Sequence, residues 1–298
     1  MTQDCVFLTV EDKMNESVFL GRCDMRRPAL IIEGTDDMWA YSYLLKQTSF
    51  TRTGNVDIVV GSGRERILGY HDEGQLSFEY VILLDADHDR WLNRCRQDER
   101  IIYTHYYSVE NYFTCTRVIE ATVSDFADMF TRNDTAEVIV REVEESLSPI
   151  YAAIVMKIEN GWCISLERCG IDRWMDSGTG FLDPLKLASY VSDELKKTGV
   201  MSGPEPVECC EAITSIDTGN GISLPGIDMV VSGKHKLKAV YYRFKAHFPE
   251  IMKHRNLRTF QMDLAKNGHM SEEVASLVAE IESRLGRLLE SRASLPVS

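Results

Sequence analysis

Long hydrophobic runs are missing from this chain, and their absence excludes one class of protein. No apolar stretch among the 298 residues approaches the roughly 18 residues that a membrane-spanning helix needs. The N-terminus, MTQDCVFLTVEDK, has no basic region followed by an apolar core, so the sequence predicts no secretory signal. We therefore expect a cytoplasmic protein without membrane association.

Two familiar binding motifs are also missing. The eight cysteines are scattered without a C-x-x-C pair, which argues against a zinc ribbon and a disulfide framework. No Gly-Lys-Ser/Thr follows Gly61-Ser62-Gly63, so these glycines do not form a Walker loop. We interpret them as a strand-to-helix turn; the alternative is a turn that presents Arg64 or Arg66 to a phosphate.

Positive charge is scarce over the chain as a whole. The 33 Lys and Arg residues face 46 Asp and Glu residues, and the formal net charge is −13. This balance argues against a protein that coats nucleic acid. One segment, residues 234–258, is nevertheless strongly basic, with a single acid, and can hold phosphates locally. Its basic members are Lys234, Lys236, Lys238, Arg243, Lys245, Lys253, Arg255 and Arg258, against Glu250.

Alternating strand and helix patterns are present in the first third of the chain. Apolar residues make up 44% and charged residues 27% of the composition, which is ordinary for a globular protein. The alternation predicts an α/β fold with a parallel sheet flanked by helices. We expect strands at 28–33, 56–60, 79–84 and 101–103, with one more within 5–10, and helices at 36–46, 64–71 and near 89–98.

Helical patterns dominate the remainder. Apolar spacing predicts helices at 118–130, 136–155, 183–197, 237–248 and 271–292, and Gly and Pro make 199–227 rich in loops. The apolar stripe of the last helix, which includes Leu277, Ile281 and Leu285, is typical of a core or dimer contact. We therefore expect a core over 1–115, a helical insertion with a loop-rich connection over 116–227, and a return to the core with C-terminal helices over 228–298.

Acidic side chains follow two of the predicted strands. Glu33 ends the first apolar run, and Asp37 falls in the first turn of the next helix. Asp85 and Asp87 follow a second apolar run, where alternation in an extended segment places both on one side. Because parallel strands release their carboxyl ends into one crevice, we expect these acids to converge. Four carboxylates need a cation between them, and an oxygen-only set suits Mg²⁺ or Mn²⁺.

Three residues near these acids have other expected roles. Ser108 can cap a helix with Glu110 in its first turn, which offers a further hydroxyl and carboxylate. Asp89 is interpreted as a helix cap. His88 is interpreted as a residue that faces solvent or contacts the metal ligands without binding the metal itself. The aromatic residues of YYSVENYF can stack bases, although packing at the sheet edge is the favoured interpretation.

The motifs IIEGTDD, ILLDADHD and YSVENYF, in this order, resemble the Toprim core of the overcoming-lysogenization-defect (OLD) nucleases. They resemble the DUF4435 group more closely, which includes the Toprim effector of the PARIS anti-phage system. The three motifs cover roughly residues 28–115. Ser232-Gly233-Lys234 is similar to the lysine-bearing motif of these nucleases, and nothing between Cys115 and Val231 is matched.

The resemblance implies a two-metal nuclease. In it, Glu33 and Lys234 are catalytic, with Lys236 or Lys238 as substitutes for Lys234, and two Mg²⁺ or Mn²⁺ ions activate water and stabilise the leaving oxygen. It further implies an ABC-type ATPase sensor partner, cleavage of host transfer RNA after release, and a homodimer. Two alternatives stay open: an OLD-like DNA nuclease, and a Toprim module that binds metal or an ATPase partner without cutting. The implied metal ligands are Glu33, Asp37, Asp85, Asp87, Ser108 and Glu110.

Overall fold

The chain divides into two compact units. A computed structural model describes residues 8–10, 27–35, 38–46, 56–126, 135–167, 169–176, 179–199, 208, 210–211 and 226–293. Unit 1 comprises Met1–His105 with Ser271–Ser298, and unit 2 comprises Tyr106–Met270. The last helix belongs to the unit of the sheet, whereas residues 106–115 and 228–270 group with the helical unit. We describe each unit separately.

Unit 1 is built on a parallel sheet in the order β1-β3-β2-β4-β5. The central strands β2 and β4 are buried along their whole length, as expected for a parallel sheet covered on both faces. The predicted α/β fold with a parallel sheet is therefore confirmed. The strands are β1 (Leu8–Thr9), β2 (Ala29–Ile32), β3 (Asp57–Val60), β4 (Tyr80–Leu84) and β5 (Ile101–Tyr103).

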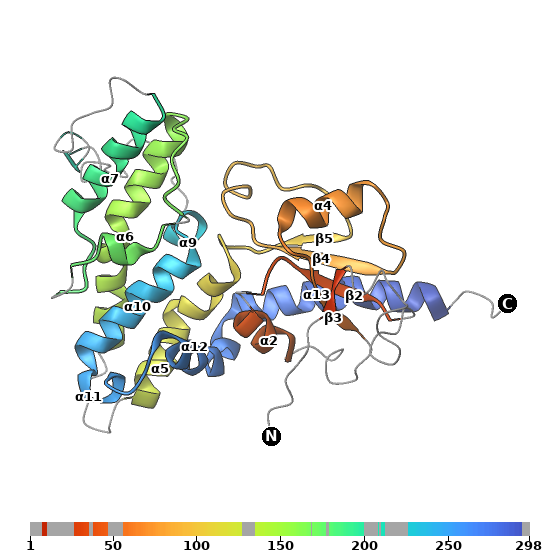
Figure 1. Ribbon diagram of the computed structural model, residues 1–298. Coiled ribbons are helices and arrows are strands. Elements are labelled where there is room, and N and C mark those ends of the chain that lie inside the picture. Colours follow the sequence, from red (N-terminus) through yellow and green to blue (C-terminus); the bar gives the residue numbers. More distant parts are fainter. Residues whose placement is uncertain are drawn as a thin grey trace. The chain divides into compact units, whose positions relative to one another are not determined.

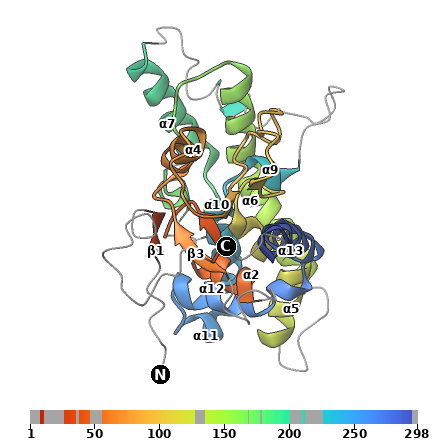
Figure 2. The same cartoon turned by 90° about the vertical axis from the view of Figure 1, so that its right-hand side faces the viewer.

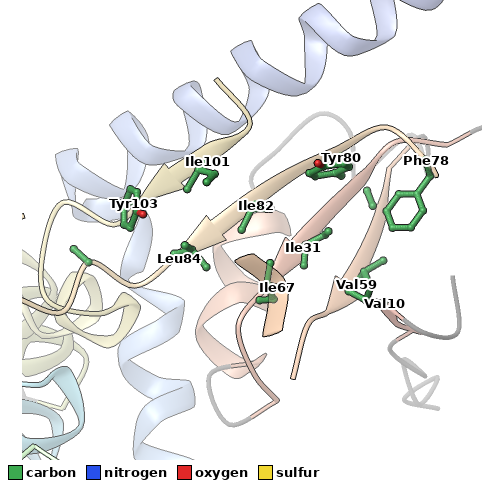
Figure 3. Close-up of a cluster of buried hydrophobic side chains, with 12 residues drawn as sticks. Val10, Ile31, Val59, Ile67, Phe78, Tyr80, Ile82, Leu84, Ile101 and Tyr103 are labelled. Atoms are coloured by element: carbon green, nitrogen blue, oxygen red, sulfur yellow. The ribbon is translucent and has the colours of Figure 1, made fainter. Parts of the chain in front are cut away.

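Among the described residues of unit 1, the helices α2 (Met38–Lys46), α4 (Arg64–Asp72) and α13 (Glu272–Ala293) flank this sheet (Figure 1). The crossover through α2 leads from β2 to β3, and the crossover through α4 leads back across the sheet from β3 to β4. Because right-handed crossovers in opposite directions lie on opposite faces, α2 and α4 cover different faces of the sheet. Ile67 of α4 packs into a buried cluster with Ile31, Val59 and Ile82 on one face (Figure 3). Helix α13 contacts β4 and α2.

Helix α13 belongs to the core of unit 1. Leu277, Ile281 and Leu285 on its apolar stripe are buried, so the core interpretation of that stripe is confirmed. Arg284 also fixes the helix, because its Nη1 donates to the carbonyls of Asp98 and Ile101 at 3.0 and 2.8 Å. The C-terminal helix thus stabilises the strand β5 region.

The helix predicted near 89–98 is wrong. Residues 87–93 form turns, and Asp87 and Asn93 have φ values of 47° and 54°, outside the α-helical region. Long-range bonds hold this segment instead, since Arg90 donates to the carbonyls of Tyr103 and Thr104 at 3.1 and 3.0 Å. Tertiary contacts therefore override a local helical pattern.

Unit 2 is helical. Helix α10 lies along α6 and also contacts η1 (Figures 1 and 2). Phe126, Phe244 and Phe260 form an aromatic core between helices, with ring centroids 4.9 to 6.5 Å apart. The elements are η1 (Val109–Thr114), α5 (Thr116–Phe126), α6 (Thr135–Glu159), η2 (Ile171–Arg173), α7 (Pro184–Lys197), α9 (Ile227–Val230), α10 (Gly233–His247), α11 (Pro249–Met252), α12 (Leu257–Lys266) and η3 (Gly268–Met270).

The helices predicted for this part of the chain are confirmed over their described residues, and α12 is an element that the sequence analysis did not anticipate. Asp183 caps α7 by accepting from the backbone of Leu185 at 2.9 Å. Across the described ranges, none of the helices has the length and apolar character needed to cross a membrane.

Candidate functional site

The first candidate site lies where the strand order of unit 1 reverses. The chain passes from β2 through α2 to β3, whereas β4 leads on to β5 on the other side of β2. Open α/β sheets place ligand sites outside the carboxyl ends of strands at this point. Glu33 and Asp85 directly follow β2 and β4, and the Asp85 amide donates to Glu33 Oε1 at 2.8 Å. The two acidic strand ends are therefore in contact.

A glycine turn fixes Glu33 from the other side. The Gly63 amide donates to the Glu33 carbonyl at 2.8 Å. A Cβ atom on Gly61 would lie 2.0 Å from Ile67 Cγ1, so only glycine fits between the turn and α4. The strand-to-helix interpretation of this turn is confirmed, and the turn brings Arg64, the first residue of α4, beside the acids.

Arg64 is the centre of the acidic cluster. Its Nη1 lies 2.9 Å from Asp87 Oδ2 and 3.1 Å from Asp89 Oδ2, and its Nε lies 3.8 Å from Glu33 Oε1. Its Nη2 donates to the Asp85 carbonyl. We call this set the acidic edge: Glu33, Asp85, Asp87 and Asp89 around Arg64.

The acidic edge keeps its arginine charged. Burial acts to lower the pKa of Arg64, but the carboxylates of Asp87, Glu33 and Asp89 outweigh it, and the pKa is raised overall. The guanidinium also lies 5.6 Å from the centre of the Tyr103 ring, a cation–π contact. A permanent positive charge therefore stands among the acids.

The side chains of Asp85 and Asp87 do not follow the predicted alternation. Asp87 has a left-handed φ of 47°, so the backbone is not extended there. The Asp85 carboxylate accepts from the Tyr41 hydroxyl at 3.1 Å, whereas that of Asp87 reaches Arg64. Asp89 caps no helix, because none forms at this place, and its carboxylate joins the acidic edge instead.

The acidic edge fits a hard divalent cation in donor chemistry but is closed around a guanidinium. Its donors are carboxylate oxygens, which suit Mg²⁺ or Mn²⁺. Two of them already converge on a single cationic nitrogen of Arg64. Over the described part of the chain, no three His, Cys, Asp or Glu side chains form a group arranged to hold a metal ion. Asp37, a predicted ligand, lies outside the described residues.

The second candidate site lies in unit 2 around Ser108, which caps η1. Ser108 Oγ donates to Glu110 Oε2 at 2.7 Å and accepts from the Gly233 amide at 3.2 Å. Two motifs 125 residues apart, Ser-Val-Glu and Ser-Gly-Lys, are thereby in direct contact. Sequence spacing alone carries no sign of this contact.

Gly233 makes the approach possible. A Cβ atom there would lie 2.6 Å from Ser108 Oγ and 2.8 Å from the Asn111 backbone nitrogen. The start of α10 can therefore meet η1 only when this position carries no side chain. The Ser-Gly-Lys segment thus has a packing requirement that is independent of any chemistry of its lysine.

The three candidate lysines of α10 have different surroundings. Lys234 is exposed in the first turn. Lys236 is buried, and its Nζ donates to Asp228 Oδ1 at 2.6 Å, an oxygen that also accepts from Asn111 Nδ2 at 3.2 Å. Lys238 forms an ion pair with a carboxylate of η2. We call Ser108, Glu110, Asn111, Asp228, Gly233 and Lys236 the Ser108–Lys236 cluster.

Much of the basic segment is compensated inside unit 2. Arg243 is buried, 3.7 Å from Glu142, and its guanidinium lies 4.1 Å from the centre of the Phe181 ring. Arg255 pairs with Asp263 at 2.8 Å. With Lys236 and Lys238 also paired, the segment offers less positive charge to phosphates than its sequence indicates.

Three of the aromatic side chains near Ser108 are buried. Tyr107, Tyr112 and Phe113 are buried and belong to unit 2, and burial leaves their rings without the exposed faces that base stacking needs. A Cβ on Gly268 would touch the Phe113 ring at 2.5 Å, which shows how closely η3 approaches it.

The predicted site residues thus fall into two groups. Glu33, Asp85 and Asp87 belong to unit 1, whereas Ser108, Glu110 and Lys234 belong to unit 2. The sequence suggests Arg64 only as an alternative phosphate contact, whereas the structure places it in the acidic edge. A search with models of known protein families found no match for this chain, and neither did a search of curated proteins.

Proposed function

We propose that this protein is a divalent-metal-dependent nuclease with a Toprim-type core, which hydrolyses phosphodiester bonds in nucleic acid. The observation that carries the proposal is the acidic edge: carboxylates at the carboxyl ends of β2 and β4 gather around a positive charge. The parallel sheet and the reversal of strand order at this point agree with such a site.

Each residue has a role in this proposal. Glu33, whose carboxylate accepts from the Asp85 backbone amide, would hold Mg²⁺ or Mn²⁺ with Asp85 and Asp87 of the acidic edge. The motif resemblance alone adds Asp37, Ser108 and Glu110 as ligands. Two such ions supply an activated water and stabilise the leaving oxygen of a phosphodiester. Lys234 would neutralise charge on the phosphate. Lys234 is exposed, whereas Lys236 is buried, and this difference in access to solvent favours Lys234 over its neighbour.

The biological setting rests on the motif resemblance to the DUF4435 group. We propose a cytosolic anti-phage effector that an ABC-type ATPase sensor restrains, and that cuts host transfer RNA as a homodimer after release. A DNA nuclease of the OLD type would use the same acids on another substrate. A Toprim module that only binds its partner would need none of them for catalysis.

The test is cleavage of transfer RNA and of supercoiled plasmid by the purified full chain with Mg²⁺ or Mn²⁺. Glu33→Gln is the informative variant, because glutamine keeps an oxygen that can accept from the Asp85 amide while it loses the charge. Glu65→Gln is the matched control, an exposed acid in the first turn of α4. We expect Glu33→Gln to lower cleavage by about a hundredfold or more, and Glu65→Gln to leave it unchanged.

The substrates separate the alternatives. Metal-dependent cuts in transfer RNA that vanish in Glu33→Gln support the proposal, and the same cuts should appear when RNA ends are sequenced from expressing cells. Cuts in DNA alone favour the DNA nuclease. If the folded, cation-loaded chain cuts neither transfer RNA nor DNA, the remaining alternative is the module that only binds its partner.

A further inference from the structure

Exposed positive charge is concentrated on one stretch of unit 2, residues 251–270, which runs from the end of α11 through α12 and η3. None of the exposed side chains of this stretch is acidic. The chain as a whole has 46 Asp and Glu residues against 33 Lys and Arg, so this surface differs in sign from the protein that carries it. We call its exposed residues the basic face. They are Lys253, His254, Asn256, Arg258, Thr259, Met262, Lys266, His269 and Met270.

The packing of α12 determines which side chains reach solvent. Phe260 is buried, and its ring lies 4.9 Å from that of Phe244 in the core of unit 2. Arg258, Met262 and Lys266 follow one another at four-residue spacing on the exposed side of the helix. Eight residues of helix rise about 12 Å, which is roughly the axial rise of three to four nucleotides of one strand. The two cationic groups are therefore spaced for separate phosphates.

The charges of the basic face are only weakly neutralised. In the part of the chain that the structure describes, Lys253 and Arg258 form no ion pair. Lys266 lies 3.4 Å from Asp263, but that carboxylate also binds Arg255 at 2.8 Å, and the Lys266 side chain is 64% exposed. An exposed pair of this kind holds a lysine weakly. All three cationic groups are therefore open to an anion from solution.

Arg258 does not serve the stability of its own helix. It lies in the first turn of α12, which contains no acid, and the positive end of the helix dipole disfavours a cation there. Asn256 already caps the helix by accepting from the Thr259 amide at 2.9 Å. Because helix stability favours an acid at this place, the arginine fits a role in binding an anion better than a role in folding.

The chemistry of the basic face favours nucleic acid over a lipid or protein partner. Met262 and Met270 are its only large apolar members, and none of its members is a Phe, Trp or Tyr. A membrane-binding helix needs a continuous apolar face, and a protein interface is anchored by large side chains. Phosphate groups need spaced cations and hydrogen-bond donors, which this face supplies. The exposed acids Glu250 and Asp125 border it and confine the attractive surface to α12 and its flanking turns.

We propose that the basic face is a docking surface for the phosphate backbone of nucleic acid, with Lys253, Arg258 and Lys266 as its charged contacts. The inference rests on the proposed function, because it concerns the substrate of the same enzyme. It gives unit 2 a binding role that is separate from hydrolysis. Contacts to phosphates position a nucleic acid without reading its sequence, so binding should depend strongly on salt and should need no divalent cation.

The test is binding of fluorescein-labelled total transfer RNA and of a labelled DNA duplex to the full chain, measured by fluorescence anisotropy over a series of KCl concentrations. EDTA in the buffer keeps cleavage out of the measurement. The double variant Arg258→Gln/Lys266→Gln removes two charges from the basic face. Lys196→Gln/Lys197→Gln is the matched control, because it removes two exposed charges from α7 of the same unit.

We expect the affinity of Arg258→Gln/Lys266→Gln for transfer RNA to be about tenfold lower than that of the unchanged chain in about 50 mM KCl. Its logarithmic dependence of affinity on salt should be less steep by about one unit for each lost phosphate contact. The α7 control should remain within about twofold of the unchanged chain. A loss with RNA or with DNA supports the docking surface, and the larger loss identifies the preferred nucleic acid.

A charge-preserving variant protects the test against misfolding. Arg258→Lys/Lys266→Arg keeps both charges and should bind like the unchanged chain, because contacts of this kind depend on charge. The melting temperature of Arg258→Gln should not fall, since the substitution removes a cation from the positive end of the α12 dipole. Weaker binding by a variant of unchanged stability is then a property of the surface.

The outcomes separate this inference from the proposed function. An equal affinity of Arg258→Gln/Lys266→Gln and the unchanged chain, or an equal loss in the α7 control, overturns the docking surface. Charge-dependent binding to phosphatidylserine vesicles without binding to RNA or DNA overturns it as well. If the face binds transfer RNA in EDTA but no Glu33-dependent cleavage follows with Mn²⁺, the docking surface stands and the nuclease function falls. If Glu33-dependent cleavage has an unchanged KM in Arg258→Gln/Lys266→Gln, the function stands and the docking surface falls.

Discussion

The acidic edge of unit 1 and the Ser108–Lys236 cluster of unit 2 are both polar, yet they differ in exposure. Glu33 and Asp87 have side chains that are 19% and 43% exposed, whereas Glu110 and Lys236 are 1% and 6% exposed as residues. In the exposed cluster, water and ions can replace a partner. In the buried cluster, each donor and acceptor depends on the neighbour that the fold supplies.

Because of this difference, substitutions in the buried cluster should mainly change stability, and substitutions in the exposed cluster should mainly change ion binding. Changes in the Ser108–Lys236 cluster leave buried polar groups without partners, which is costly. Changes in the acidic edge alter charge at a site open to solvent, which affects ion binding more than folding. Substitutions at Gly233, Lys236, His235 and Arg64 test this contrast.

Gly233→Ala should have the largest effect on stability. Its Cβ would meet Ser108 Oγ and the Asn111 backbone at 2.6 and 2.8 Å, so α10 and η1 must separate, at a cost of about 3 kcal/mol. Urea unfolding of the full chain measures this cost. Gly226→Ala is the control, because nothing lies within 4 Å of its added Cβ. Equal effects of the two variants would show that the contact between motifs is not tight.

Lys236→Met should lower the free energy of unfolding by about 2 kcal/mol, because it leaves the Asp228 carboxylate without the ammonium at 2.6 Å. Lys234→Met should leave stability almost unchanged, since Lys234 is exposed. Activity should show the reverse order if Lys234 is the catalytic lysine. Loss of cleavage in a folded Lys236→Met protein, with full activity in Lys234→Met, would reassign that role.

His235 should make stability depend on pH. Burial lowers its pKa in the folded chain, opposed by the bond between Nε2 and the Cys169 carbonyl at 2.7 Å. The unfolded chain then binds more protons as pH falls below about 6.5, so stability is present above that pH and decreases below it. We expect the free energy of unfolding to be about 1 kcal/mol lower at pH 5.5 than at pH 6.5, as measured by urea unfolding at both pH values. His235→Gln should remove this part of the pH dependence, and an unchanged profile would contradict the prediction.

Arg64→Gln should have the smallest effect on folding, below about 1 kcal/mol in a chelating buffer, because its carboxylate contacts are partly exposed. The same unfolding series measures it. A loss as large as that of Lys236→Met would mean that the acidic edge is a structural cluster like the one in unit 2.

The sequence predicts the strands of unit 1 well, because short apolar runs bounded by Gly, Pro or acidic residues are typical of buried parallel strands. It also places Glu33 and Asp85 correctly at neighbouring strand ends, since β2 and β4 pair in parallel. The helix predicted at 89–98 does not form, because Arg90 and Arg96 form hydrogen bonds to residues distant in sequence, and a local pattern does not predict such bonds.

Helical periodicity distinguishes Lys234 from Lys236. Lys236 shares a helix face with Val240 and Phe244, both buried, whereas Lys234 is off that face. A 3.6-residue period through these apolar positions predicts that Lys236 faces inward. No such signal exists for Arg64, because its place among the acids depends on how the glycine turn directs α4 over the ends of β2 and β4.

A crystal structure of the full chain with Mn²⁺, measured for anomalous scattering, tests the proposed metal site. We expect a manganese peak about 2.1 Å from a carboxylate oxygen of Glu33. A manganese peak elsewhere, or no peak at the acidic edge at saturating Mn²⁺, would show that these acids do not hold the metal.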